Sequence, residues 1–216
     1  GIPLGMVQVL DGTVYCGSEG AILDFQGVPS HASMPELGRN PAYAISDIIQ
    51  RLPQLQDPGR YRGLVLATII QVDVGERAFG TQASRGKLLL TIRGEHEEEL
   101  QRLQDELEAL ARERAEAYGL GLEIGYCDVF PNTVSHPQSN EKVRAVCREL
   151  GIPVREMPGP YRGSEDFGHY TKAIPGAFFE IGSGESCPDL HTVGMDFPDA
   201  IIGTAVDIFR GLIGRA

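Results

Sequence analysis

Hydrophobic and polar residues follow two different periods between residues 20 and 130, and these periods predict six elements. Apolar residues recur at helical spacing over 41–52 and over 95–118. Short β-branched or alternating runs predict four strands, at 21–27, 64–74, 87–93 and 122–126. The resulting order, β-α-β-β-α-β, predicts a ferredoxin-like α+β domain with both helices on one face of its sheet. The other face, or an edge strand, then needs cover from another domain or a second subunit.

Capping and breaking residues set the expected helix ends. Asn40 followed by Pro41 is typical of a helix start, and Pro53 is expected to end that helix. The second helix begins with acidic residues in its first turn, where their negative charge is stabilised by the positive end of the helix dipole. This helix is expected to end at Gly119.

The pattern changes after Pro131. Helices are expected at 139–150 and 199–213, with a short helix after the GSEDF loop that starts at Gly163. Strands are expected at 153–157 and, fully buried, at 176–181, whereas residues 1–18 read as an extended segment. A sheet of two strands is marginal. This α/β segment is therefore expected to need partner strands that it does not itself supply.

Charge and composition exclude several classes of protein. The chain has 216 residues, 42% of them hydrophobic, and a net charge of −11, which disfavours binding to nucleic acid or to an anionic membrane surface. No apolar run has the length of a membrane helix, and no signal peptide is expected. The four scattered cysteines form no C-x-x-C pair, which argues against a structural zinc site of the usual spacing. Without a signal peptide, reduced thiols in a cytoplasmic protein are expected.

Two of the five histidines occupy places where a functional group would be expected. His31 lies in a loop between a strand and a helix, and His191 follows a strand close to Asp189 and Asp196. The loop that contains His191 and the GSEDF loop flank the same expected strand, so both can open at one sheet edge. His96 reads as a surface residue, His136 as a solvated loop residue, and His169 as a packing or surface residue. From the residues alone, His31 fits an ordinary loop residue as well as a functional one.

Four motifs in one order carry a resemblance to a known family. They are GVPSHASMP around His31, FGTQASRGKLLLTIR ending at Arg93, GSEDF, and the pair Leu190-His191. In this order and spacing, the chain resembles the aminoacylase/carboxypeptidase family of cocatalytic metallopeptidases. Within it, the chain is most similar to amidohydrolases of N-acyl amino acids, such as hippurate and auxin-conjugate hydrolases.

The resemblance implies a division of the chain and roles for five residues. Residues 1–19 would end a catalytic-domain segment or form a linker, 20–130 would be the dimerising lid domain, and 131–216 would be the last catalytic segment. His191 would bind metal, His31 would stabilise the oxyanion in the partner subunit's site, and Arg93 would hold the substrate carboxylate. Ser164 and Glu165 would line the substrate pocket. Gly80 stands where the family usually has Asn, which removes one polar contact to substrate.

The resemblance also implies a cofactor and a partner. A complete family enzyme holds two divalent ions, zinc or manganese, and hydrolyses the amide bond of an N-acyl amino acid or small peptide as a homodimer. The family's other metal ligands and its general base precede the stretch that GIPLG at residue 1 resembles. The chain alone is therefore expected to be inactive and to bind no metal. The alternative is a non-catalytic dimerisation or ligand-binding module.

Overall fold

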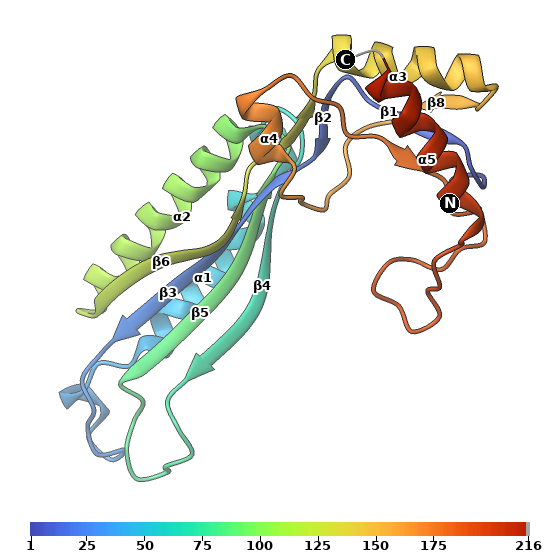
Figure 1. The fold of residues 1–216 in the computed structure, drawn as a ribbon. Helices are drawn as coiled ribbons and strands as arrows, with labels where there is room; N and C mark the ends of the chain where they lie inside the picture. Colours follow the sequence, from blue (N-terminus) through green and yellow to red (C-terminus); the bar gives the residue numbers. More distant parts are fainter. Residues whose placement is uncertain (215–216) are drawn as a thin grey trace. The chain divides into compact units, whose positions relative to one another are not determined.

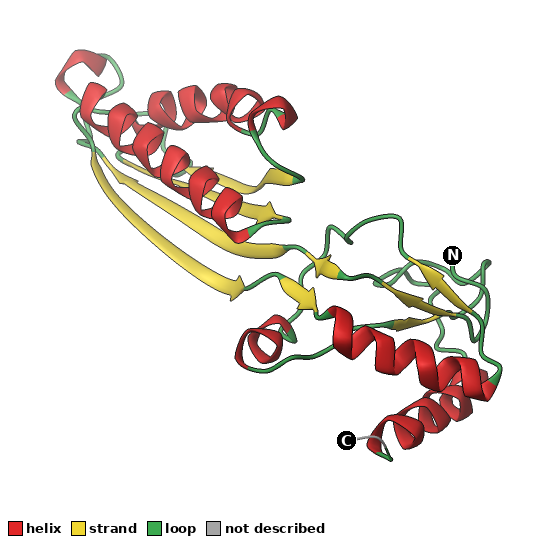
Figure 2. Cartoon of the chain, turned by 90° about the horizontal axis from the view of Figure 1, so that it is seen from above, coloured by secondary structure: helices red, strands yellow, loops and turns green. Residues whose placement is uncertain are grey.

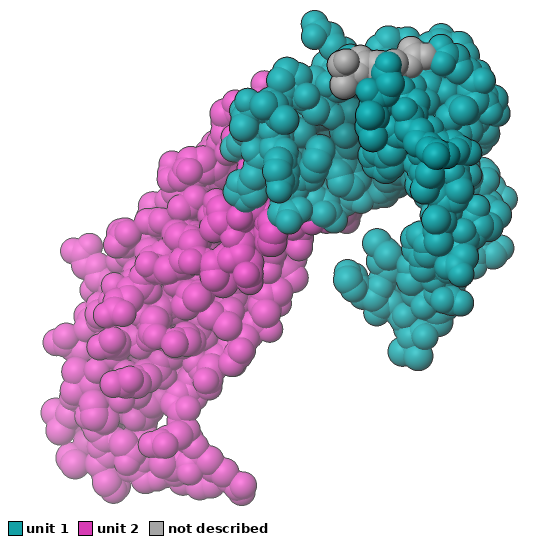
Figure 3. Space-filling view, in the orientation of Figure 1, with its two compact units in different colours: residues 1–15, 133–161, 165–216 teal, residues 16–132, 162–164 magenta. Residues whose placement is uncertain are grey.

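The computed structural model describes residues 1–214 and divides them into two compact units (Figure 3). The ferredoxin-like unit comprises residues 16–132 and 162–164. The flanking unit comprises residues 1–15 and 133–161, together with the described residues from 165 to 214. Each unit has its own hydrophobic core.

The ferredoxin-like unit contains the six expected elements in the expected order (Figure 1). They are β3 (Gly17–Gln26), α1 (Pro41–Leu55), β4 (Val65–Val74), β5 (Arg85–Gly94), α2 (Glu97–Ala117) and β6 (Gly121–Phe130), with 3₁₀ turns at Pro35–Leu37 and Pro58–Arg60. The strands pair antiparallel in the order β4-β5-β3-β6. Both helices cover the same face of the sheet (Figure 2), which confirms the predicted fold class.

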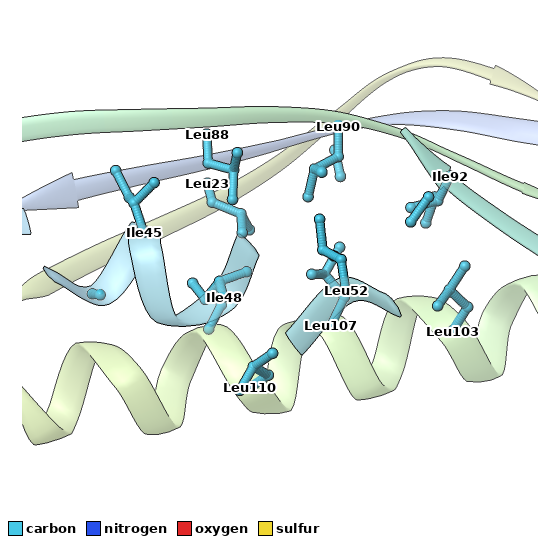
Figure 4. Packing of buried hydrophobic residues seen from close by; sticks show 14 of the residues in the cluster. Leu23, Ile45, Ile48, Leu52, Leu88, Leu90, Ile92, Leu103, Leu107 and Leu110 are labelled. Carbon is cyan, nitrogen blue, oxygen red and sulfur yellow. The ribbon is translucent and has the colours of Figure 1, made fainter. Parts of the chain in front are cut away.

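The core of this unit follows from period-two alternation on the strands and helical spacing on the helices (Figure 4). On β5, every second residue points to the helices and is buried, while Lys87 and Arg93 lie on the opposite face. The buried side chains come from β5 (Leu88, Leu90, Ile92), β3 (Leu23), α1 (Ile45, Ile48, Leu52) and α2 (Leu103, Leu107, Leu110).

Helix α1 continues past the residue that was expected to end it. Asn40 caps the helix, its Oδ1 accepting from the Ala42 N–H at 3.0 Å, but the helix runs through Pro53 to Leu55. Proline removes one hydrogen bond and crowds the carbonyl of Ile49. That cost falls in the last turn, where Leu52 is anchored in the core with 3% exposure. The prediction that Pro53 ends the helix was therefore wrong by two residues.

In the flanking unit, the strand nearest the N-terminus lies at the centre of a sheet. β1 (Val7–Val9) lies between β8 (Val154–Glu156), to which it is parallel, and β9 (Glu180–Ile181), to which it is antiparallel. A second pair joins β2 (Gly12–Tyr15) to β7 (Thr133–Ser135). The helices are α3 (Pro137–Leu150), α4 (Gly168–Ala173) and α5 (Ala200–Ile213). Residues 1–18 thus include two strands, where only an extended segment was expected.

The strand expected at 176–181 is shorter than the sequence suggested. Only Glu180 and Ile181 are in strand conformation, and residues 176–181 are half-buried rather than buried. Within the described residues, β9 has one neighbour, β1, and pairs with it at two positions. A strand with a single short ladder cannot order the whole apolar run.

No helix in the described part of the chain combines the length and apolar composition needed to cross a bilayer.

Candidate functional site

The loop that carries His31 is bound to a second loop of the same unit. After β3 the chain enters residues 27–40, which lie beside residues 78–84 of the β4–β5 connection (Figure 1). The Gln82 N–H donates to the Ser30 carbonyl at 3.0 Å, and the Ala32 N–H donates to the Gly80 carbonyl at 3.0 Å. The backbone of His31 forms an isolated antiparallel β-bridge with that of Thr81. Two loops from distant parts of the sequence therefore hold the His31 backbone in place.

The Gln82 side chain strengthens this contact. Its Nε2 donates to Ser30 Oγ at 2.6 Å and to the Pro35 carbonyl at 3.0 Å. A Cβ on Gly38 would overlap the Gln82 amide, so only glycine leaves room for it there. Sequence reasoning did not single out Gln82, although it lies within the motif that ends at Arg93.

The His31 ring is exposed, and one of its nitrogens is bound within the loop. Nδ1 lies 2.7 Å from Ser33 Oγ and accepts from the Ser33 backbone N–H at 3.1 Å. The other nitrogen, Nε2, has no protein partner among the described residues. A cavity of ≈ 480 Å³ lies beside this loop pair, lined by Pro29, Thr81, Gln82, Ser84, Arg85 and their neighbours.

Arg93 and Ser164, both predicted to bind substrate, are brought together. Arg93 Nη1 donates to the Ser164 hydroxyl at 3.3 Å and to the Arg162 carbonyl at 3.2 Å. Ser18 Oγ, 3% exposed, donates to Ser164 Oγ at 2.8 Å. Sequence reasoning missed Ser18, because nothing local distinguishes one strand serine from another. Burial, with the negative charge of Glu95 beside it, raises the pKa of the nearby Cys16 thiol to about 11.

Glu165 belongs to the flanking unit, near a cluster of tyrosines that share one carboxylate. Tyr15 and Tyr161 each donate to Glu180, to Oε1 and Oε2 respectively, both at 2.7 Å. Burial, followed by the bond to Glu180, raises the pKa of Tyr15 far above the usual range for a phenol. The charge of Glu165 adds to this shift. Both tyrosines therefore act as hydrogen-bond donors that hold Glu180 in place.

His191 lies in an exposed loop with a left-handed backbone, φ 66°. Among residues 1–214, no three His, Cys, Asp or Glu side chains come close enough together to hold a metal ion. His136, expected to be solvated, is half-buried at the start of α3, where its Nδ1 accepts from the Gly176 N–H at 3.1 Å. His136 is therefore a packing residue.

Comparison with known proteins assigns the ferredoxin-like unit. Residues 16–119 match the profile of the peptidase dimerisation domain of the M20 family. These residues are an M20 peptidase dimerisation domain. The match includes the His31 loop, the motif that ends at Arg93 and the whole of α2, which confirms the resemblance inferred from the motifs.

Relatives extend the similarity beyond the dimerisation domain. An uncharacterised hydrolase of Staphylococcus aureus strain RF122 is 23% identical over 197 residues, covering 88% of this chain and 51% of the relative. A crystal structure from methicillin-resistant S. aureus superposes with a TM-score of 0.85 at 21% identity, covering 99% of this chain and 56% of that one. The chain thus spans about half the length of the relatives it matches.

A third relative is described as binding metal. It is a dinuclear metal-binding M20 peptidase from Bacillus subtilis, with a TM-score of 0.78 at 18% identity, covering 98% of this chain and 53% of that one. At such identities these likenesses establish the fold alone. Within residues 1–214 of the present chain, His191 is not part of any group of three or more His, Cys, Asp or Glu side chains that could hold a metal ion.

The dimerisation domain separates the two candidate groups that it carries. The His31 loop adjoins the Arg85 end of β5, where the Gly27 N–H donates to the Ser84 carbonyl, whereas Arg93 lies next to the last residue of β5. A strand advances about 3.4 Å per residue, so β5 covers roughly 27 Å between Arg85 and Arg93. One small substrate cannot contact both groups of the same domain.

Proposed function

We propose that this chain is part of a metal-dependent hydrolase that cleaves the amide bond of N-acyl amino acids or small peptides, and that it acts as a homodimer. The separation of His31 and Arg93 carries the proposal. A His and an Arg at opposite ends of one sheet serve a single substrate only if each site takes them from two different copies. A dimerisation domain supplies the second copy.

In this arrangement each site combines groups from two subunits. Arg93, with Ser164 and Glu165, belongs to the subunit that binds the substrate carboxylate, and His31 enters from the partner. Both hydrogen bonds of Arg93 within residues 1–214 use Nη1, which leaves its other N–H groups to form a two-point contact with a carboxylate.

His31 would act as a hydrogen-bond donor to the scissile carbonyl oxygen. Its Nδ1 accepts from the Ser33 backbone N–H, and a neutral ring with one accepting nitrogen carries its proton on the other. The exposed Nε2–H then stabilises the negative charge that develops on the carbonyl oxygen as the amide is attacked. An exposed loop at the end of the sheet is well suited to reach a neighbouring subunit.

The metal chemistry would depend on residues outside this chain. His191 is the chain's own candidate ligand, and the proposal assigns the remaining ligands to the half of the relatives that the chain does not span. No catalytic step at a metal is therefore assigned to residues of this chain. What the chain contributes is carbonyl recognition by His31, carboxylate recognition by Arg93, and the dimer.

The test compares the chain of residues 1–216 with the longer protein that contains it. N-acyl amino acids such as hippurate are offered to both, with zinc or manganese present, and released amino acid is measured. We expect turnover by the longer protein and background rates for the chain, and elemental analysis should find stoichiometric metal only in the longer protein. A longer protein that is inert across a panel of N-acyl amino acids and dipeptides would instead support a non-catalytic binding or dimerisation module.

A further inference from the structure

We infer that Ser33 is a positioning residue that selects the tautomer of His31, so that Nε2 always presents a proton to the substrate carbonyl. The effect of the tautomer on catalysis rests on the proposed function, whereas the contacts that select the tautomer do not. Ser33 contacts only the far side of the ring, at Nδ1, and is therefore distinct from any group that touches substrate.

Two donors of Ser33 converge on the same ring nitrogen. The backbone N–H can only donate, so at 3.1 Å it requires Nδ1 to be an acceptor. With Nδ1 accepting, the hydroxyl at 2.7 Å must also donate its proton to the ring. The other tautomer would place an N–H against the backbone N–H and leave Nε2 as an acceptor. The loop therefore disfavours the Nδ1–H form.

A tight turn places Ser33 where it can do this. The Met34 N–H donates to the His31 carbonyl at 2.8 Å, which closes a turn over residues 31–34. Ser30 Oγ donates to the Met34 carbonyl at 3.0 Å and also accepts from Gln82. The turn is thus bound at both ends, and the Ser33 side chain folds back onto the ring.

The tautomer matters because only one form can stabilise an oxyanion. With the proton on Nε2 the ring donates to the carbonyl oxygen, whereas in the other form it would turn a lone pair toward that oxygen and repel it. A carboxylate at Nδ1 would instead accept a hydrogen bond from that nitrogen and would favour the opposite neutral tautomer, with a bare Nε2. Ser33 presents donors to Nδ1, which leaves the proton of the ring on Nε2, facing the substrate.

The test reads the tautomer directly in this chain. Long-range ¹H–¹⁵N correlation spectra of the ¹⁵N-labelled chain at neutral pH resolve the two ring nitrogens, and the His31→Gln spectrum identifies the His31 signals. We expect Nε2 protonated and Nδ1 bare. Ser33→Ala should move the tautomer ratio about fivefold toward Nδ1–H, the effect of one net hydrogen bond. Ser33→Thr keeps the hydroxyl and should leave the ratio unchanged, as should Met34→Ala in the same turn.

A proton on Nδ1 in the unsubstituted chain, or an unchanged ratio in Ser33→Ala, would overturn the inference. In the longer protein, Ser33→Ala should lower kcat severalfold with KM unchanged, and Ser33→Thr should restore it. The two proposals fail separately. Normal turnover in His31→Ala removes the role of His31 in catalysis, whereas the tautomer spectra test Ser33 whether or not the longer protein is active.

Discussion

His31 and Arg93 lie at opposite ends of the same four-stranded sheet. Arg93 pairs with Ser18 near the start of β3, and the His31 loop leaves β3 after Gln26, which pairs with Arg85 at the other end of β5. The antiparallel ladder between these ends is continuous, so the separation is a property of a rigid element rather than of a flexible loop. Any shared role of the two residues therefore requires two copies of the domain.

The first prediction tests action across subunits. In the longer protein, His31→Ala should remove one oxyanion donor and lower turnover by about 10²–10³, without loss of metal. His191→Ala should lose metal. When the two inactive variants are unfolded together and refolded, mixed dimers should recover part of the activity, because one site then combines an intact His191 with a partner's intact His31.

Met34→Ala is the matched control, since this exposed side chain lies in the same loop. It should keep near-normal turnover. If mixed dimers form, as shown by two affinity tags, and activity does not return, then His31 acts within its own subunit.

The second prediction concerns the contact between Arg93 and Ser164. Arg93→Met should lower the free energy of unfolding of the chain by about 1–2 kcal/mol, because it removes the bonds to the Ser164 hydroxyl and the Arg162 carbonyl. Ser164→Ala should lower the free energy of unfolding by less than Arg93→Met does. The double variant should lower it by less than the sum of the two single changes. Urea denaturation of the four proteins measures the coupling. Strict additivity would mean that this hydrogen bond does not form in solution.

The third prediction concerns Gly80, which stands where the family usually has Asn. Its backbone is outside the left-handed region, and a Cβ would meet no atom within 4 Å. Gly80→Asn should therefore change the free energy of unfolding by no more than about 0.5 kcal/mol, and should lower KM for N-acyl amino acids in the longer protein. Gly27→Ala is the contrasting variant, because its Cβ would overlap the Arg39 carbonyl. It should cost about 1–3 kcal/mol. Equal losses of unfolding free energy in Gly80→Asn and Gly27→Ala would contradict the prediction that a side chain fits at Gly80 and not at Gly27.

The fourth prediction concerns the dimer. β4 is an edge strand, and its Ile69, Ile70 and Val72 are 39%, 61% and 47% exposed. Unpaired backbone groups beside exposed apolar side chains favour pairing with a second copy. Light scattering should show a dimer at micromolar concentrations, and Ile70→Lys should shift it toward monomer without loss of helical signal. Lys87→Glu, a charge change on the neighbouring strand β5, should leave the dimer intact. A monomeric unsubstituted chain would refute the prediction.

Sequence periodicity determined the ferredoxin-like unit because the information is local. Leu100, Leu103 and Leu107 share one face only in a helix, so their spacing predicts a helix. The alternation of apolar and polar residues after Lys87 predicts a strand with one buried face. The helix cap at Asn40 was also predicted correctly from the local sequence. The helix end at Pro53 was misjudged, since packing of Leu52 outweighed the local cost of proline in the last turn.

Only the tertiary structure decided which distant segments meet. Val7–Val9 is a central strand because it pairs with residues near 154 and 181, and no local pattern in three residues encodes such partners. The contacts of Ser18 with Ser164, of Gln82 with Ser30, and of Ser33 with the His31 ring were likewise invisible in the sequence. Small polar residues are common on strands and loops. The role of these serines and of Gln82 depends on which segments of the same chain lie beside them. The packed core determines that arrangement, and local composition does not.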